Sequence, residues 1–252
     1  MPIQIDAKSI VDLVAKEGWH LTKDKTTNAP IIEAEGETYP FCHPVLIHLK
    51  KYRLEQNPEL KYQHMKAAHD YLWPDTVWHY WTERRFRTHC EDWKLVTWAG
   101  GAATGKSFDA AKIACEFWLA DPRNRAVIVA SSSLESLNAR IWGYCTRFMH
   151  EMQVPLPFNY RRGAPPKILF EARDTIHGMF AVAAKRGDDD AAISNWIGRH
   201  PNKGLLLVLD EGTELPMAIL NALPNLEAGQ DNFQCIVIGN SLSHYDLHGS
   251  LS

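Results

Sequence analysis

The sequence predicts a three-layer α/β fold, in which helices cover both faces of a mainly parallel central sheet, with a mainly helical region before it. Three observations predict this fold. From about residue 90 onward, short β-rich runs alternate with amphipathic helical stretches, which is the pattern of βαβ units. A glycine-rich turn at residues 100–107 joins the first such run to a helical stretch. The run Leu205–Leu209 is entirely apolar, as a parallel strand covered on both faces requires.

Composition narrows the class of protein. The 252 residues are 45% hydrophobic and 23% charged, which suits one α/β domain with an N-terminal appendage. No apolar run approaches the roughly 20 residues that span a bilayer, and the N-terminus lacks the pattern of a secretory signal. The five cysteines are scattered and odd in number, which favours reduced thiols, so we expect a cytoplasmic protein without a membrane role. The net charge of −3 requires any DNA contact to be local.

Two regions follow from a change of composition near residue 90. Residues 1–90 hold seven of the twelve histidines and no long strand-like apolar run, so we expect a mainly helical N-terminal region. Residues 91–252 carry the α/β pattern and are expected to form the second domain. Its first elements are a strand at Trp93–Ala99, a helix at Ser107–Ala120 closed by Asp121-Pro122, and a strand at Arg125–Ala130.

A second βα unit and four further strands complete the expected sheet. Ser132 and Glu135 have the spacing of a capping box, which predicts one helix with its apolar face at Leu134, Leu137, Ile141, Cys145 and Phe148. The later strands are expected at Lys167–Phe170 and His177–Ala184, which could form a hairpin, then at Leu205–Leu209 and Phe233–Ile238.

The glycine-rich turn matches the phosphate-binding loop of P-loop proteins. Its residues are Gly100, Gly101, Ala102, Ala103, Thr104, Gly105, Lys106 and Ser107. Glycines let the backbone curl so that several N–H groups point inward, and the helix that follows adds its positive end. Lys106 is expected to reach the β- and γ-phosphates of ATP, and Ser107 to place its hydroxyl on Mg²⁺. The alternative, an incidental glycine turn, is disfavoured by the strand before it and the helix after it.

Two adjacent carboxylates end the apolar strand at Leu205–Leu209. Asp210 is expected to hold the Mg²⁺ shell, and Glu211 to orient and deprotonate the attacking water, which ATP hydrolysis needs. An ordinary solvated strand end is the structural alternative. Because a strand, Arg125–Ala130, lies between the loop and these acids, we expect a RecA-like P-loop NTPase of the additional-strand, catalytic-glutamate class. Helicases, recombinases and packaging motors belong to this class.

Asn240 directly follows the last expected strand. Its amide could contact the γ-phosphate or the lytic water and report hydrolysis to the rest of the domain. Gly239-Asn240-Ser241 is also ordinary turn chemistry, so a simple turn residue is an equal alternative.

The order of these pieces resembles the ATPase domain of large terminase subunits from tailed bacteriophages. The resemblance covers about residues 90–250 and rests on the phosphate loop, Arg186-Gly187, the strand ending at Asp210-Glu211, and the strand ending at Gly239-Asn240 with Tyr245 after it. It implies ATP-driven translocation of double-stranded DNA into a procapsid by a homo-oligomeric ring, with a portal and a small terminase subunit as partners. It also places Asn240 at the family's coupling motif. Full terminases carry a nuclease domain after the motor, and no nuclease activity is expected of these residues.

One departure from the family pattern concerns charge. Many terminases carry an arginine within the phosphate loop, where this chain has Ala102. Losing such an arginine costs on the order of 10³ to 10⁵ in turnover in other NTPases, so another cation is expected. The candidates, from the same chain or a ring neighbour, are Arg140, Arg147, Arg161, Arg162 and Arg186. Each of them taken singly also fits a solvated surface arginine.

Three alternatives stay open. The segment Trp81–His89 interleaves basic and aromatic residues, so it could lie on the nucleotide or on DNA, although a solvated helix packed by its aromatics is the simpler interpretation. A helicase-like or other DNA-remodelling ATPase of the same class would carry the same motifs. A nucleotide switch would bind ATP and hydrolyse it negligibly.

Overall fold

A computed structural model describes most of the chain, in two compact units. The residues that it describes are 6–91, 93–101, 103–154, 156, 158–161, 163–184 and 200–240. The first unit is formed by Met1–Val77 with Met152–Leu156, and the second by Trp78–Glu151 with Pro157–Ser252. The expected helical stretch at Trp81–His89 therefore belongs to the unit that carries the phosphate loop.

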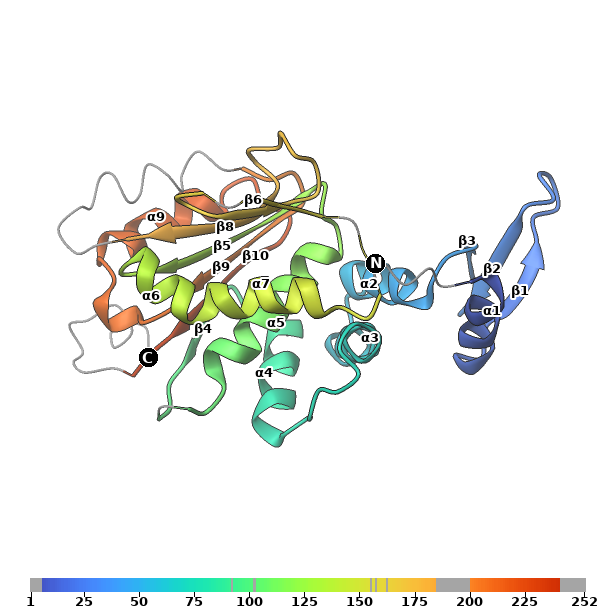
Figure 1. Ribbon diagram of the computed structural model, residues 1–252, viewed down its shortest axis with the longest axis horizontal. Helices are drawn as coiled ribbons and strands as arrows, with labels where there is room; N and C mark the ends of the chain where they lie inside the picture. The colour runs from blue at the N-terminus through green and yellow to red at the C-terminus, as the bar shows by residue number, and fades with distance from the viewer. Residues whose placement is uncertain are drawn as a thin grey trace. The chain divides into compact units, whose positions relative to one another are not determined.

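The first unit combines three helices with a small antiparallel sheet of order β1-β2-β3 (Figure 1). Its elements are α1 (Ala7–Lys16), β1 (His20–Lys23), β2 (Pro30–Ala34), β3 (Glu37–Pro40), α2 (Pro44–Leu54) and α3 (Pro58–Leu72). Asp6 and Asn57 accept backbone N–H bonds at the starts of α1 and α3, and His43 does so at the start of α2 through Nδ1, 3.1 Å from the Val45 nitrogen. The sheet was not expected, because its strands have only four or five residues and are largely exposed.

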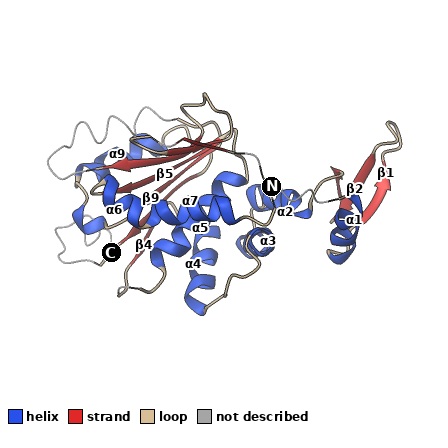
Figure 2. Ribbon diagram, in the orientation of Figure 1, coloured by secondary structure: helices blue, strands red, loops and turns tan. Residues whose placement is uncertain are grey.

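The second unit is built on a seven-stranded sheet of order β4-β10-β9-β5-β8-β7-β6 (Figure 2). The strands are β4 (Leu95–Trp98), β5 (Arg125–Ser131), β6 (Asn159–Arg161), β7 (Lys167–Leu169), β8 (Gly178–Ala183), β9 (Gly204–Leu209) and β10 (Phe233–Ile238). The first five strands in the spatial order are parallel, and β7 and β6 add an antiparallel edge. The expected hairpin of the 167–184 segment is thereby confirmed as the β7–β8 pair.

Helices cover both faces of this sheet, so the predicted three-layer α/β fold is confirmed (Figure 1). They are α4 (Tyr80–Cys90), α5 (Lys106–Leu119), α6 (Leu134–Ala139), α7 (Ile141–Glu151) and α9 (Ala218–Glu227), with a 3-10 turn at Gly212–Glu214. On one face, α5 contacts β5, β9 and β10. On the other, Ile219 and Leu226 of α9 join the core cluster formed by every second residue of β9 and β10. Each fully buried aliphatic or phenylalanine side chain in these layers stabilises the fold by about 1.5–3 kcal/mol.

The strand inserted between the loop strand and the acid strand is β10, and not the expected Arg125–Ala130 strand, because β5 pairs with β9 on the side away from β4. β10 pairs in parallel with β4 on one side and with β9 on the other, so the strand before the glycine loop and the strand before the two acids are separated by one strand. In this register Ile238 lies opposite Trp98, and Val237 lies opposite Leu209. The carboxyl ends of β4, β9 and β10 therefore meet at the same edge of the sheet.

The helix expected after Ser132 differs from the structure in two ways. The N-cap is Ser133, whose side chain accepts the Ser136 N–H at 3.1 Å, and not Ser132. The single expected helix is also broken into α6 and α7 at Arg140, whose φ of −121° and ψ of −108° are not helical. The apolar periodicity continues across the break, so the sequence pattern gives no sign that the helix is interrupted there.

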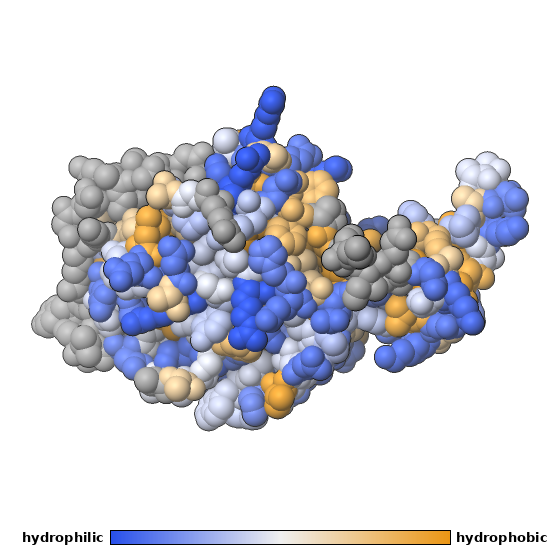
Figure 3. Space-filling model, in the orientation of Figure 1, coloured by the Kyte–Doolittle hydropathy of each residue, from blue (hydrophilic) through white to orange (hydrophobic). Residues whose placement is uncertain are grey.

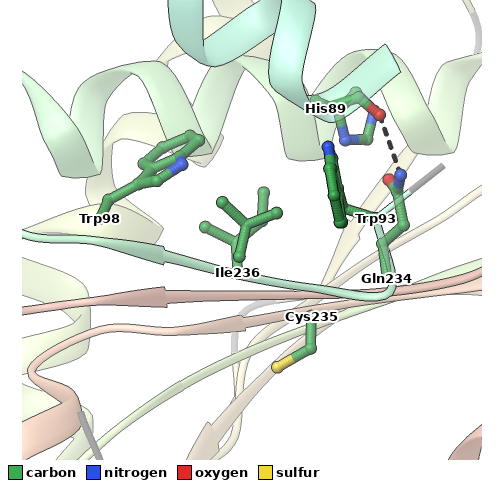
Figure 4. A pocket seen from close by; sticks show the side chains of 7 residues that line it. His89, Trp93, Trp98, Gln234, Cys235 and Ile236 are labelled. Atoms are coloured by element: carbon green, nitrogen blue, oxygen red, sulfur yellow. Dashed lines mark hydrogen bonds between the residues drawn. The ribbon is translucent and has the colours of Figure 1, made fainter. Parts of the chain in front are cut away.

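A polar contact joins α4 to the central strands. The side-chain amide of Gln234, on β10, donates to the main-chain carbonyl of His89 at 2.8 Å. Figure 4 shows this bond beside the small pocket between Trp93 and Trp98, with Ile236 on its floor. The C-terminal end of α4 is thus hydrogen-bonded to β10, the strand that pairs with β4.

The surface mixes hydrophilic and hydrophobic residues on the face seen in Figure 3. Among the described residues, none of the helices has both the length and the apolar composition that crossing a bilayer takes.

Candidate active site

The glycine loop has the backbone shape that a phosphate cradle needs. It leaves β4 at Trp98 and enters α5 at Lys106, with Gly105 as N-cap in the left-handed region at φ 75°. Gly100 has a φ of 151°, which side chains with a Cβ rarely adopt. The first N–H groups of α5 have no partners within the helix, so the loop and helix present backbone donors and a positive dipole end together.

Lys106 folds over this loop. Its ammonium donates to the Gly100 carbonyl, to the Gly101 carbonyl at 2.9 Å and to the Thr104 hydroxyl at 3.4 Å. Burial lowers the pKa of Lys106, the neighbouring Arg85 lowers it further, and Asp210 opposes the shift. A charged amine beside another positive group is stabilised by a bound anion. A phosphate group would be such an anion.

Ser107 and Asp210 come together across 103 residues of chain. The Ser107 hydroxyl donates to Asp210 Oδ1 at 3.2 Å, and the side chain of Asp210 is buried at the end of β9. Its other oxygen, Oδ2, is buried without a hydrogen-bond partner among the described residues. Burial raises the pKa of Asp210, while the Ser107 bond and the charges of Arg140 and Lys106 lower it. A hydroxyl beside a buried carboxylate with an unsatisfied oxygen fits Mg²⁺, which prefers oxygen ligands.

Glu211 occupies a strained turn at the edge of the sheet. Its φ of 56° and ψ of 50° lie in the left-handed region, which is uncommon for a residue with a side chain. Its carboxylate forms an ion pair with the guanidinium of Arg140, which stands at the break between α6 and α7. The Glu211 side chain is 20% exposed, so it can still meet a water molecule from solvent.

Asn240, which follows β10, contacts the glycine loop. Its side-chain Oδ1 accepts the Gly100 N–H at 3.0 Å, directly after β10 ends. Gly239 also donates its N–H to the Trp98 carbonyl at 3.3 Å. The tip of β10 is therefore hydrogen-bonded to the start of the phosphate loop.

The five arginines named as candidate cations are placed differently. Arg140 is beside the acids. Arg147 is paired with Glu151 and 60% exposed, and Arg161 lies on β6, at the opposite edge of the sheet from β4. Arg162 and Arg186 lie outside the described residues, as do Ala102, Gly187 and Tyr245.

One residue beside the loop was not among those candidates. Arg85, on α4, donates to the main-chain carbonyl of Thr104 at 3.0 Å and forms an ion pair with Asp109 of α5. The only signal in the sequence was the interleaving of basic and aromatic residues at Trp81–His89, which does not tell which arginine turns inward.

Comparison with known proteins supports the fold. A scan against protein-family models gives no match, and a search of curated proteins gives none either. Among solved structures, the large terminase of bacteriophage HK97 is similar with a TM-score of 0.51 and 11% identity, over 81% of this chain and 39% of that chain. The ATPase domain of the large terminase of Thermus phage P74-26 is similar with a TM-score of 0.51 and 16% identity, over 70% of each chain.

These similarities apply to the fold. The chain spans about two fifths of the HK97 large terminase and more than two thirds of the separate ATPase domain of P74-26. The fold of this chain is thus similar to that of phage large terminase ATPase domains.

Proposed function

We propose that this chain is the motor part of a viral DNA-packaging terminase, in which Mg²⁺-dependent ATP hydrolysis drives double-stranded DNA into a procapsid. The observation that carries the proposal is the convergence of Ser107 and Asp210, 3.2 Å apart, at the edge where the glycine loop and Glu211 also lie. Two segments that are distant in sequence thus form one site with donors for phosphate and ligands for a cation.

Each group then has a role that follows from its chemistry. The loop N–H groups and the Lys106 ammonium would bind the phosphates, and Ser107 and Asp210 would hold Mg²⁺, which would offset the negative charge of the phosphates. Glu211 accepts the proton of the attacking water. Asn240 links the site to β10 through its hydrogen bond with the Gly100 N–H. A movement of the loop after hydrolysis could be transmitted to the sheet through this bond.

Arg140 is the candidate cation that the described residues favour, because its charge already lies next to the acids. The site residues support an ATPase in general. The proposal that this ATPase is a terminase motor rests in addition on the fold similarity and on the order of the motifs. It implies a homo-oligomeric ring in the host cytoplasm that works with a portal and a small subunit on double-stranded DNA.

The first experiment measures phosphate release with and without Mg²⁺ for the wild type and Glu211→Gln. We expect the variant to lose turnover by a factor on the order of 10² to 10⁴ while ATP binding stays within a few fold, since only the proton acceptor is lost. Glu214→Gln is the matched control, because Glu214 lies three residues later and accepts a hydrogen bond from Ser132 at 2.8 Å instead. Unchanged turnover in Glu211→Gln would overturn its role as base.

The second experiment separates the possible ATPases. ATP-dependent protection of double-stranded DNA from nuclease in the presence of procapsids supports packaging, whereas strand separation without protection indicates a helicase. Nucleotide binding without Mg²⁺-dependent phosphate release in the wild type indicates a switch.

A further inference from the structure

Arg85 connects three parts of the second unit around the phosphate loop. Its Nη1 donates to the Thr104 carbonyl at 3.0 Å and lies 2.5 Å from Asp109 Oδ2, so one nitrogen serves a loop carbonyl and a carboxylate of α5. Its guanidinium carbon also lies 5.5 Å from the centre of the Trp98 ring, at the end of β4. The strand before the loop, the loop and the helix after it are thus in contact with a single side chain.

Burial fixes this arrangement. The side chain of Arg85 is 13% exposed and that of Asp109 only 4%. The Thr82 hydroxyl, one turn earlier on α4, is a further donor to Asp109, at 3.4 Å. A buried ion pair with additional hydrogen bonds is costly to separate, so Arg85 is held in place rather than free to swing toward a ligand.

The bond to Thr104 has a geometric consequence for the loop. In a trans peptide the C=O and the following N–H point in opposite directions. Because the Thr104 carbonyl faces Arg85 on the α4 side, the Gly105 N–H faces away from α4. Gly105 is the N-cap of α5, so its N–H belongs to the set of donors that a phosphate group meets at the start of this helix.

We propose that Arg85 is a positioning residue of the phosphate loop, which orients the Thr104–Gly105 peptide so that the Gly105 N–H is available to a bound phosphate. This inference rests on the proposed nucleotide-binding function and adds to it a residue from α4, outside the loop motif. The charge of Arg85 is already balanced by Asp109, so Arg85 does not act as the cation of the reaction.

The test compares the affinity for fluorescent ADP, with Mg²⁺, of the wild type, Arg85→Ala, Arg85→Lys and Arg84→Ala. Arg84 is the matched control, because it is the adjacent arginine on α4 but is exposed and donates only weakly, at 3.4 Å, to the Tyr80 hydroxyl. We expect Arg85→Ala to weaken ADP binding by about tenfold or more, the effect of losing one charge-assisted hydrogen bond. Arg85→Lys should recover part of the affinity, and Arg84→Ala should stay within twofold of the wild type.

The melting temperature of each variant separates positioning from packing. A lower melting temperature of Arg85→Ala with ADP affinity within twofold of the wild type would show that Arg85 only packs α4, and would overturn the inference. If Arg85→Ala does not fold, Arg85→Lys decides: wild-type affinity in that variant overturns the inference, and a several-fold loss supports it. Absence of ADP binding by the wild type would overturn the proposed function, and this inference with it.

Discussion

Replacing Asp210 by asparagine should stabilise the protein and disable it at the same time. The carboxylate is buried, its Oδ2 has no hydrogen-bond partner among the described residues, and burial raises the pKa of the group. A side-chain amide at this position would keep the shape and remove the buried charge. Such relief at a functional site is typically worth about 0.5–2 kcal/mol in the free energy of unfolding. Loss of the same charge removes the proposed ligand for Mg²⁺, and we expect turnover to fall by on the order of 10² or more.

The stability that Asp210 contributes depends on pH. An aspartate whose folded pKa is raised binds its proton more tightly in the folded state, so its contribution to stability is full at low pH and is lost as pH rises through the folded pKa. The stability difference between Asp210→Asn and the wild type should therefore be largest at pH 7 and should shrink on acidification. Urea denaturation without Mg²⁺ at several pH values measures it.

Ser107→Ala is the companion variant. It removes the donor to Asp210 Oδ1 and leaves a buried acceptor unsatisfied, so it should lower the free energy of unfolding by about 1–3 kcal/mol and also impair turnover. The two variants thus shift stability in opposite directions and activity in the same direction. If Asp210→Asn were less stable than the wild type at pH 7, the account of Asp210 as a buried carboxylate with an unpaired oxygen would be refuted.

Three further predictions test other parts of the structure. Asn240→Ala should lower turnover about fivefold, because the Gly100 N–H loses a bond worth about 1 kcal/mol, and Asn240→Asp, which keeps the acceptor, should retain most of it; steady-state kinetics decide. Arg140→Ala should reduce turnover by on the order of 10³ with ADP affinity nearly unchanged, whereas the exposed Arg123→Ala should have no effect on phosphate release. Burial lowers the pKa of His43 to about 4, so its stabilising N-cap is lost as pH falls from about 6.5 toward 4; His43→Asn, a cap that does not titrate, should flatten the pH dependence of unfolding in that window.

The parts of the fold that sequence predicts well are those in which a motif and a periodicity agree. The strands at Leu205–Leu209 and Phe233–Ile238 are apolar because both faces are covered, and their predicted bounds lie within one residue of those observed. The glycine loop lies between a strand and a helix as its motif demands. The meeting of these groups at one edge of the sheet could also be predicted, because both acids and Asn240 come after the carboxyl ends of parallel strands of the same sheet.

The parts that sequence could not predict depend on tertiary contacts. Arg140 interrupts a continuous apolar pattern, and its position beside Glu211 results from a helix break that periodicity does not record. Arg85 differs from its neighbour Arg84 only in the direction in which its side chain leaves α4. The β1–β3 sheet has short, exposed strands whose pairing is decided by turns at Asp24 and Gly36 rather than by apolar alternation.

Because β10 lies between them, β4 and β9, the strands that lead to the loop and to the acids, are not paired with each other in the described sheet. Strands two places apart in a sheet are roughly 10 Å from each other. The spacing between the glycine loop and the two acids is therefore set by β10, which lies between their strands. Deleting one residue from β10 would shift its pairing on both sides and turn its side chains to the opposite faces. Such a deletion would remove the contact between Asn240 and the loop and would also displace the acids. The length and register of β10 therefore determine the geometry of the whole candidate site.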